Sequence, residues 1–161
     1  MNIETINQSI IDADDQYIVH QLNCLTNCSA GLAKAIFDKF PYANVYAHRK
    51  YPHTPNASEQ LGNIVISGNG EDQRLIIGIF GQYYPGKPKY PTSRLDGIQA
   101  RKNAFESGLQ RIIEIPEIHS IGFPRGIGCT LAGGDWEKYE EMIKDFAVQN
   151  PHIRVKMHLY H

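Results

Sequence analysis

The sequence contains no apolar run of the roughly 18 residues that a membrane-spanning helix requires. Met1–Thr5 also lacks the start of a secretory signal, a charged segment followed by an apolar one. Basic residues do not predominate, because 16 Lys and Arg stand against 17 Asp and Glu, and they form no cluster. General nucleic-acid binding usually requires a basic face. We therefore expect a protein that binds neither membranes nor nucleic acid in general.

Cysteine is scarce, and its spacing argues against disulfides and metal binding. The three cysteines, Cys24, Cys28 and Cys129, are an odd number, and two of them are close together in sequence. This pattern does not suit a disulfide framework, so we expect reduced thiols and a cytoplasmic location. His20, Cys24 and Cys28 are evenly spaced, but a structural zinc site needs four ligands. We expect no metal and no cofactor.

Short apolar runs bounded by turn residues indicate strands. With 161 residues, of which 42% are hydrophobic, the chain is long enough to form one domain over residues 1–161. Residues 153–160 alternate apolar and polar side chains, which indicates a strand near a sheet edge with one solvated face. The other strands are expected at residues 3–6, 17–22, 64–66, 75–80 and 118–123.

Helices are expected between these strands, at residues 32–40, 42–49, 98–112 and 136–146. In the three longer segments apolar residues recur at helical spacing. Ser93 followed by Asp96 resembles a capping box before the third segment, and Asp135 is the candidate N-cap of the fourth. Strands alternating with helices predict a three-layer α/β/α sandwich around a mixed, mostly parallel central sheet.

Two strand-to-helix junctions carry the candidate chemistry. Residues 20–32 pass from a strand through small and polar residues into a helix, and residues 123–136 do so through a glycine-rich loop. Glycine lets backbone N–H groups approach an anion, and a helix N-terminus favours negative charge. Two such loops suit a diphosphate, although each alone also fits a tight turn. Neither is a P-loop or a GxGxxG motif, which argues against a kinase, a GTPase or an ordinary dehydrogenase.

The two junctions resemble those of macro domains. Residues 19–42 are similar to the first ligand loop and helix of that family, and residues 124–137 to its second phosphate loop, which also leads into a Trp-Glu helix start. The resemblance covers essentially the whole chain. It is nearest to the branch that contains the terminal ADP-ribose protein glycohydrolase and the yeast-type ADP-ribose 1''-phosphate phosphatase. It implies a macro-type sandwich with a pocket for ADP-ribose.

The resemblance also implies which residues bind ADP-ribose. Asn23 would reach the distal ribose, and Phe80 would lie near that ribose or the adenine. The adenine-reading Asp of the family falls at Gln8, which can still accept a hydrogen bond but carries no charge. The diphosphate would be held by the backbone amides of Ala30, Gly31, Leu32, Gly126, Ile127, Gly128, Cys129 and Thr130.

The catalytic positions of the family are matched only in part. Ala33 and Ala132 occupy its acidic positions, and Gln82 lies where the glycohydrolase branch uses a lysine. Glutamine is no nucleophile, so deglycosylation by that route is not expected. His20 matches a histidine of the phosphatase relative and is the candidate base for water attacking a terminal phosphate. The alternative is a histidine packed in the sheet.

Two functions therefore stay open. As an enzyme, the chain would remove a terminal phosphate from ADP-ribose 1''-phosphate or cleave an ADP-ribosyl bond. As a reader, it would bind ADP-ribose without turnover. The expected partner is ADP-ribose or an ADP-ribosylated molecule, with nucleic acid only as such a target, and the chain is expected to act as a monomer. Residues 81–93 would form a lid over the distal ribose or a stiff connection.

Overall fold

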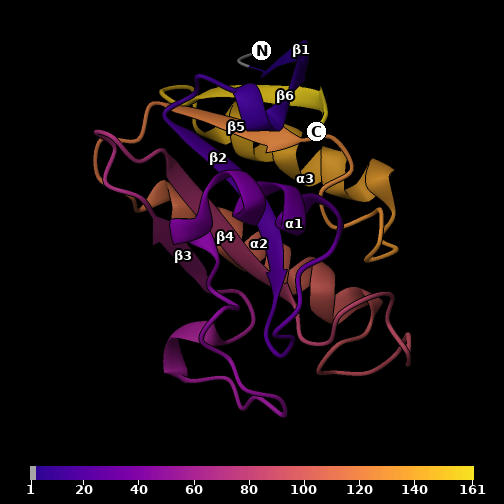
Figure 1. Ribbon diagram of the computed structural model, residues 1–161. Helices are drawn as coiled ribbons and strands as arrows, with labels where there is room; N and C mark the ends of the chain where they lie inside the picture. The colour runs from indigo at the N-terminus through magenta and orange to yellow at the C-terminus, as the bar shows by residue number, and fades with distance from the viewer. Residues whose placement is uncertain (1–2) are drawn as a thin grey trace.

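The computed structural model describes residues 3–161 and contains one sheet of six strands in the order β1-β6-β5-β2-β4-β3 (Figure 1). Neighbouring strands run parallel, except that β3 is antiparallel to β4. The expected mixed, mostly parallel sheet is confirmed. The strands are β1 (Ile3–Ser9), β2 (Tyr17–Asn23), β3 (Ile64–Ser67), β4 (Leu75–Gln82), β5 (Ser120–Pro124) and β6 (Arg154–Tyr160).

The central strands are buried on both faces. Nearly every side chain of β2, β4 and β5 is buried, which explains their continuous apolar runs. β6 instead alternates buried and more exposed side chains in its first half. It lies between β5 and the edge strand β1, so the expected position near a sheet edge is confirmed.

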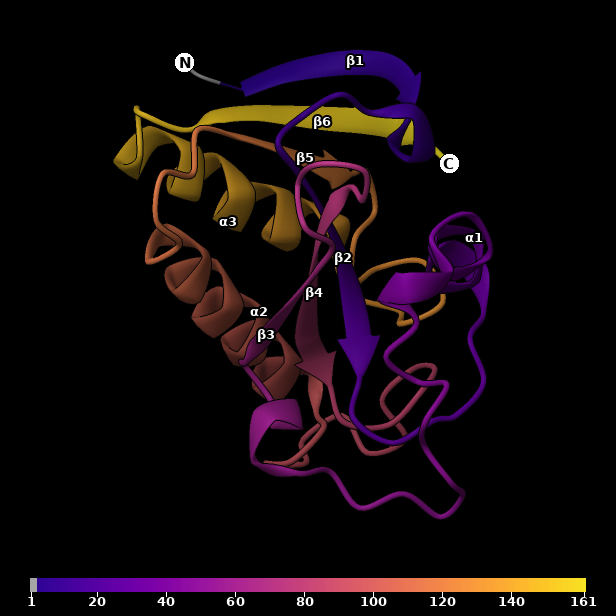
Figure 2. The same cartoon turned by 60° about the vertical axis from the view of Figure 1, so that its left-hand side comes forward.

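Helices cover both faces of the sheet. α1 (Gly31–Lys39) lies on one face, and α2 (Ile98–Ile113) and α3 (Trp136–Gln149) lie on the other (Figure 2). The apolar core is accordingly divided into two clusters, one containing Phe105 of α2 and the other Ile36 of α1. None of the helices in residues 3–161 is long and apolar enough to cross a membrane. The three layers leave the carboxyl ends of the strands open to loops, where α/β proteins usually bind ligands.

The short helix expected at residues 42–49 does not form. A single 3-10 turn at Pro41–Ala43 is followed by further turns. Asn44 Oδ1 accepts a hydrogen bond from the Tyr46 N–H at 3.1 Å. This side-chain bond replaces the backbone bond that a helix would use, which is why asparagine favours turns.

The two long helices begin differently from one another. Asp135 is the N-cap of α3 and accepts a hydrogen bond from a first-turn N–H at 3.1 Å, so this prediction is confirmed. The capping box expected for α2 is wrong, because its N-cap is Gly97. Ser93 Oγ does accept the Asp96 N–H at 3.2 Å. The Asp96 carboxylate, however, pairs with Arg101 at 2.6 Å and is not available to complete the box.

Candidate functional site

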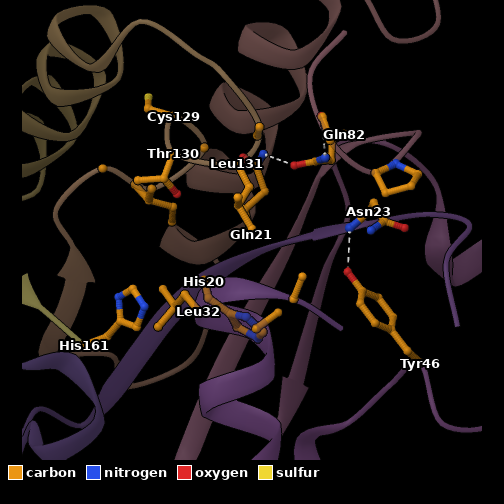
Figure 3. Close-up of a pocket in the computed structure, with 18 of the residues that line it drawn as sticks. His20, Gln21, Asn23, Leu32, Tyr46, Gln82, Cys129, Thr130, Leu131 and His161 are labelled. Carbon is orange, nitrogen blue, oxygen red and sulfur yellow. Dashed lines mark hydrogen bonds between the residues drawn. The ribbon is translucent and has the colours of Figure 1, made fainter. Parts of the chain in front are cut away.

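A pocket lies at the carboxyl ends of β2 and β4, between the start of α1 and the loop that follows β5 (Figure 3). We call residues 24–31 the first loop and residues 125–135 the second loop. Both junctions identified in the sequence contribute to this pocket. It is lined by His20, Gln21, Asn23, Cys28, Ala30, Leu32, Ala33, Tyr46, Gln82, Pro85, Gly86, Arg125, Gly126, Ile127, Gly128, Cys129, Thr130, Leu131, Ala132 and His161.

The first loop leads into a helix start that no side chain caps. Ala30 is the N-cap residue of α1 and has no side chain that can accept a hydrogen bond. Gly31 then begins the helix with a φ of +56°, a conformation that favours glycine. The first N–H groups of an uncapped helix need an acceptor, and they lie at the positive end of the helix dipole. This end of the pocket therefore suits an anion.

The second loop is curled tightly by its glycines. Gly126 and Gly128 have φ values of +85° and +75°, and the Cys129 N–H donates to the Gly126 carbonyl at 2.8 Å. A Cβ on Gly128 would lie 2.7 Å from Tyr139 Cε2 and 3.0 Å from Gln21 Oε1. No larger residue fits there unless the loop shifts. A curled backbone of this kind can present successive N–H groups to an anion.

Leu131 connects the two loops across the pocket. It belongs to the second loop and is 59% exposed, although it is a large apolar side chain. Its Cδ1 lies 2.8 Å from the position that a Cβ on Gly31 would occupy. Leu131 therefore packs directly on the glycine that begins α1, and it covers part of the cleft between the loops.

A pair of amide side chains joins β2 to β4 beside the pocket. Gln21 Nε2 donates to Gln82 Oε1 at 2.7 Å (Figure 3). Gln82 Nε2 in turn donates to the carbonyls of Tyr84 at 2.9 Å and Gly86 at 3.3 Å. Gln82 is 8% exposed and uses both ends of its amide to hold its surroundings. At the position where the resemblance would place a lysine, this chain therefore has an uncharged amide that is already hydrogen bonded.

Arg101, in the first turn of α2, holds the segment after β4 in place. Its Nη2 pairs with Asp96 Oδ2 at 2.6 Å. Its Nη1 donates to the carbonyls of Gly86 at 2.7 Å and Ala132 at 3.3 Å, both of which line the pocket. One buried guanidinium thus ties the segment after β4 to the second loop. Charge-assisted bonds of this kind are stronger than neutral ones.

His20 extends from β2 toward α1 and is almost completely enclosed. It is 2% exposed, and its Nδ1 is buried with no hydrogen-bond partner among residues 3–161. Burial lowers the pKa of His20 to about 4, because the charged imidazole would lose its hydration. The ring is therefore neutral at pH 7.

The described part of the pocket contains no Asp or Glu. Arg125 and His161 are exposed and line it. In Figure 3 His161 lies on the opposite side of the pocket from Asn23 and Tyr46. A pocket with an uncapped helix start and an arginine, and with no acidic side chain in its described lining, is complementary to an anionic ligand.

Comparison of the sequence with known proteins finds no matching family model and no matching curated protein. Solved structures do match. The macrodomain of Mycobacterium tuberculosis DarG has a TM-score of 0.72 and 20% identity, over 97% of this chain and 96% of that one. The macrodomain of Thermus aquaticus DarG has a TM-score of 0.70 and 16% identity, over 98% and 97%. The Trypanosoma brucei macrodomain in complex with ADP-ribose has a TM-score of 0.63 and 13% identity, over 98% and 62%.

The chain has a macrodomain-like fold. The three-layer architecture expected from the sequence is thereby confirmed. At these identities the likeness shows the fold alone. It does not place the chain in the branch of the glycohydrolase and the yeast-type phosphatase.

Most residues that the resemblance assigned to ADP-ribose binding line this pocket. They are Asn23, Ala30, Leu32, Gly126, Ile127, Gly128, Cys129 and Thr130. His20, the candidate base, lines it as well. Gly31 is not part of the lining, but it begins α1 between two lining residues. The structure therefore brings the two predicted loops together at one pocket.

Gln8 and Phe80 lie outside the pocket. Gln8 is on β1, and its Nε2 donates to the Asp12 carbonyl at 3.2 Å. Phe80 is a core residue in the apolar cluster under α1 and is not part of the pocket lining, so the structure does not bring this expected ribose or adenine contact to the pocket. The physical reason is that β4 continues past it to Gln82. The strand ends two residues later than expected, so Gln82 and not Phe80 reaches the pocket.

Several pocket residues were not identified from the sequence. Gln21 lies near the end of β2 and was not singled out. Gln82 was named at the family's lysine position but not as a pocket residue, and a strand boundary placed two residues later would have placed it there. Arg125 belongs to the second loop, and a positive charge next to a predicted phosphate-binding loop could have identified it as a pocket residue. Tyr46 and His161 come from segments far from either loop, and no local pattern marks them.

The three cysteines are free thiols in different surroundings. Burial raises the pKa of both Cys24 and Cys129 to about 12. Cys28 is exposed and lines the pocket. Among residues 3–161 no three His, Cys, Asp or Glu side chains gather to hold a metal ion. The evenly spaced His20, Cys24 and Cys28 therefore do not come together as a metal site.

Proposed function

We propose that the chain binds ADP-ribose, free or attached to another molecule, in the pocket between the two loops. The observation that carries this proposal is the pocket itself. It combines a curled glycine loop with an uncapped helix start, and its described lining has no Asp or Glu side chain. Backbone N–H groups at two loops suit the two phosphates of a diphosphate. The similar Trypanosoma brucei macrodomain in complex with ADP-ribose supports the choice of ligand.

The geometry supports one orientation of the ligand. The diphosphate would lie between the first residues of α1 and residues 126–130. The distal ribose would lie toward Asn23 and Tyr46, as the family resemblance implies. The nucleoside would then point toward Arg125 and His161, which lie across the pocket (Figure 3). The planar guanidinium of Arg125 can stack on an aromatic base, and this contact does not need an acidic side chain that hydrogen bonds the base.

The proposal extends to the setting of the protein. The chain would act as a monomer. Three free thiols support a reducing, cytoplasmic setting. The partner would be ADP-ribose or an ADP-ribosylated molecule, and residues 1–161 would act as one domain.

A second candidate function is removal of the terminal phosphate from ADP-ribose 1''-phosphate. The observation in its favour is His20, whose buried Nδ1 has no partner among residues 3–161 and which lines the pocket. A neutral imidazole can take a proton from attacking water. A pKa of about 4, however, makes it a weak base. Cleavage of an ADP-ribosyl bond by a lysine has less support, because Gln82 is bound on both sides.

The two candidates are separated by one pair of measurements. Isothermal titration with ADP-ribose, AMP and ribose 5-phosphate should show binding that is tightest for ADP-ribose. The protein is then incubated with ADP-ribose 1''-phosphate, and the release of inorganic phosphate is measured. Binding without release establishes a reader, whereas release that the His20→Ala variant loses establishes the phosphatase. Absence of ADP-ribose binding would contradict the proposal itself.

A further inference from the structure

A buried ion pair lies behind Asn23, outside the pocket lining. Arg49 is 4% exposed and Glu59 is 5% exposed. The Arg49 Nε and Nη2 atoms both donate to Glu59 Oε2, at 2.9 Å and 2.7 Å. Taking two charges out of water costs several kcal/mol per ion unless further hydrogen bonds offset it. The remaining bonds of Arg49 therefore indicate what the pair holds in place.

Those remaining bonds go to the end of β2 and the start of the first loop. Arg49 Nη1 donates to the carbonyls of Asn23 at 3.1 Å and Thr26 at 3.0 Å. The guanidinium also lies over the Tyr46 ring, 4.5 Å from its centroid. Tyr46 Oη accepts the Asn23 N–H at 2.8 Å (Figure 3). The backbone of Asn23 is thus held at its N–H by Tyr46 and at its carbonyl by Arg49.

The side chain of Asn23 is oriented by the same loop. Its Oδ1 accepts the N–H groups of Leu25 at 3.0 Å and Thr26 at 2.8 Å. Its Nδ2 has no hydrogen-bond partner among residues 3–161, and the residue lines the pocket. An amide whose oxygen is occupied in this way has two N–H donors left for a ligand. Ribose hydroxyl and ring oxygens can accept them.

The second carboxylate oxygen of Glu59 is also hydrogen bonded. Its Oε1 accepts the Asn56 N–H at 3.2 Å and lies 3.0 Å from His53 Nε2. Both oxygens of Glu59 are therefore used, and the carboxylate is fixed relative to the segment that carries Arg49. We call Arg49, Glu59 and Tyr46 the Arg49 clamp.

We propose that the Arg49 clamp positions Asn23 for the sugar beyond the diphosphate, and so sets the preference of the pocket for ADP-ribose over ADP. The inference rests on the proposed ADP-ribose binding. Arg49 acts through Asn23, so it is a positioning residue. The diphosphate cradle at residues 30–32 lies beyond Thr26 and is held by α1, which buries Ile36 and Phe37. The Tyr46 ring packs edge to face on Phe37, with the centroids 5.4 Å apart, so a variant that keeps this ring leaves the α1 contact in place. Loosening the clamp should therefore weaken the sugar contact and spare the diphosphate contact.

The first test compares two ligands on matched variants. Tyr46→Phe removes only the hydroxyl that accepts the Asn23 N–H, and Arg49→Lys keeps the charge beside Glu59 but loses the forked donors. Tyr42→Phe is the control, because its hydroxyl binds the Arg74 carbonyl away from the pocket. We expect each clamp variant to weaken ADP-ribose binding about tenfold and to leave ADP binding within about twofold. Equal losses for both ligands would overturn the inference.

The second test uses the ligand-free protein. Hydrogen exchange of the amides of residues 23–28 should be faster in both clamp variants, whereas exchange in α1 should match the wild type. Unchanged exchange in residues 23–28 would overturn the clamp whatever the ligand is. If the wild type bound neither ADP-ribose nor ADP, the proposed function would fail, and exchange would still report whether the clamp holds the loop.

Discussion

The rings of His20 and Phe37 meet edge to face, with their centroids 5.5 Å apart, on the α1 side of β2. This contact belongs to the enclosure that lowers the pKa of His20 from 6.5 to about 4. The unfolded chain exposes the same imidazole, so between these two pKa values it binds more protons than the folded chain does.

The first prediction follows from that difference in pKa. As pH falls from 6.5 toward 4, His20 should cost the protein about 2–3 kcal/mol of unfolding free energy. Above about pH 7.5, where the imidazole is neutral in both the folded and the unfolded chain, His20 should no longer make the stability depend on pH. Urea denaturation of the wild type and of His20→Gln between pH 4.5 and 7.5 would measure it. The wild type should lose more stability than the variant at the acidic end, and parallel profiles would show that His20 is not enclosed as described.

The second prediction concerns the amide pair of Gln21 and Gln82. Gln82→Leu leaves the Gln21 amide hydrogen without its partner and leaves the Tyr84 carbonyl with only the longer bond from Arg101 Nη2, at 3.3 Å. The free energy of unfolding should therefore fall by about 1–3 kcal/mol. Gln99→Leu is the matched control, because that exposed glutamine bonds only Asn103 on the same helix. Chemical denaturation should separate the two variants clearly. Equal effects would argue against a structural role for the pair.

The third prediction concerns Gly128. Gly128→Ala strains a φ of +75° and forces a Cβ against Tyr139, so ADP-ribose affinity should fall more than about tenfold. Gly70→Ala carries the same backbone strain, with a φ of +76° in the turn between β3 and β4. It should lose stability but keep its affinity. Calorimetric titration of both variants is the measurement, and equal affinities would remove the second loop from the site.

The fourth prediction concerns Leu131. Leu131→Ala removes the side chain that packs on Gly31 across the cleft, so bound ADP-ribose should dissociate several-fold faster. Stability should change by less than about 0.5 kcal/mol, because the residue is largely exposed. Val148→Ala on α3 has similar exposure, 60% against 59%, and should change neither quantity. Stopped-flow displacement measures the dissociation rate, and an unchanged rate would mean that Leu131 does not cover the ligand.

Patterns of neighbouring residues in the sequence were sufficient to predict the strands and loops that form the site. The apolar runs predicted the strands, and the glycine and polar residues after β2 and β5 predicted the two loops that meet at the pocket. Asp135 was predicted as a cap because a carboxylate before a helix bonds its first N–H groups regardless of the rest of the fold. These features depend on neighbours within a few residues.

The residues that were missed depend on contacts distant in sequence. Asp96 follows Ser93 at capping-box spacing, but its carboxylate forms an ion pair with Arg101 and accepts a hydrogen bond from the Tyr83 N–H. Arg49 lies in an irregular segment with no pattern, and it becomes important only because folding places it beneath Asn23. No periodic pattern in the sequence indicates such contacts.

The unequal burial of the three thiols has a practical consequence. Burial keeps Cys24 and Cys129 protonated at neutral pH, and only the thiolate reacts readily with alkylating reagents. Cys28 alone is exposed, and it lies at the edge of the pocket. A maleimide fluorophore would therefore attach at one place on the unmodified sequence, where its emission can report the arrival of a nucleotide.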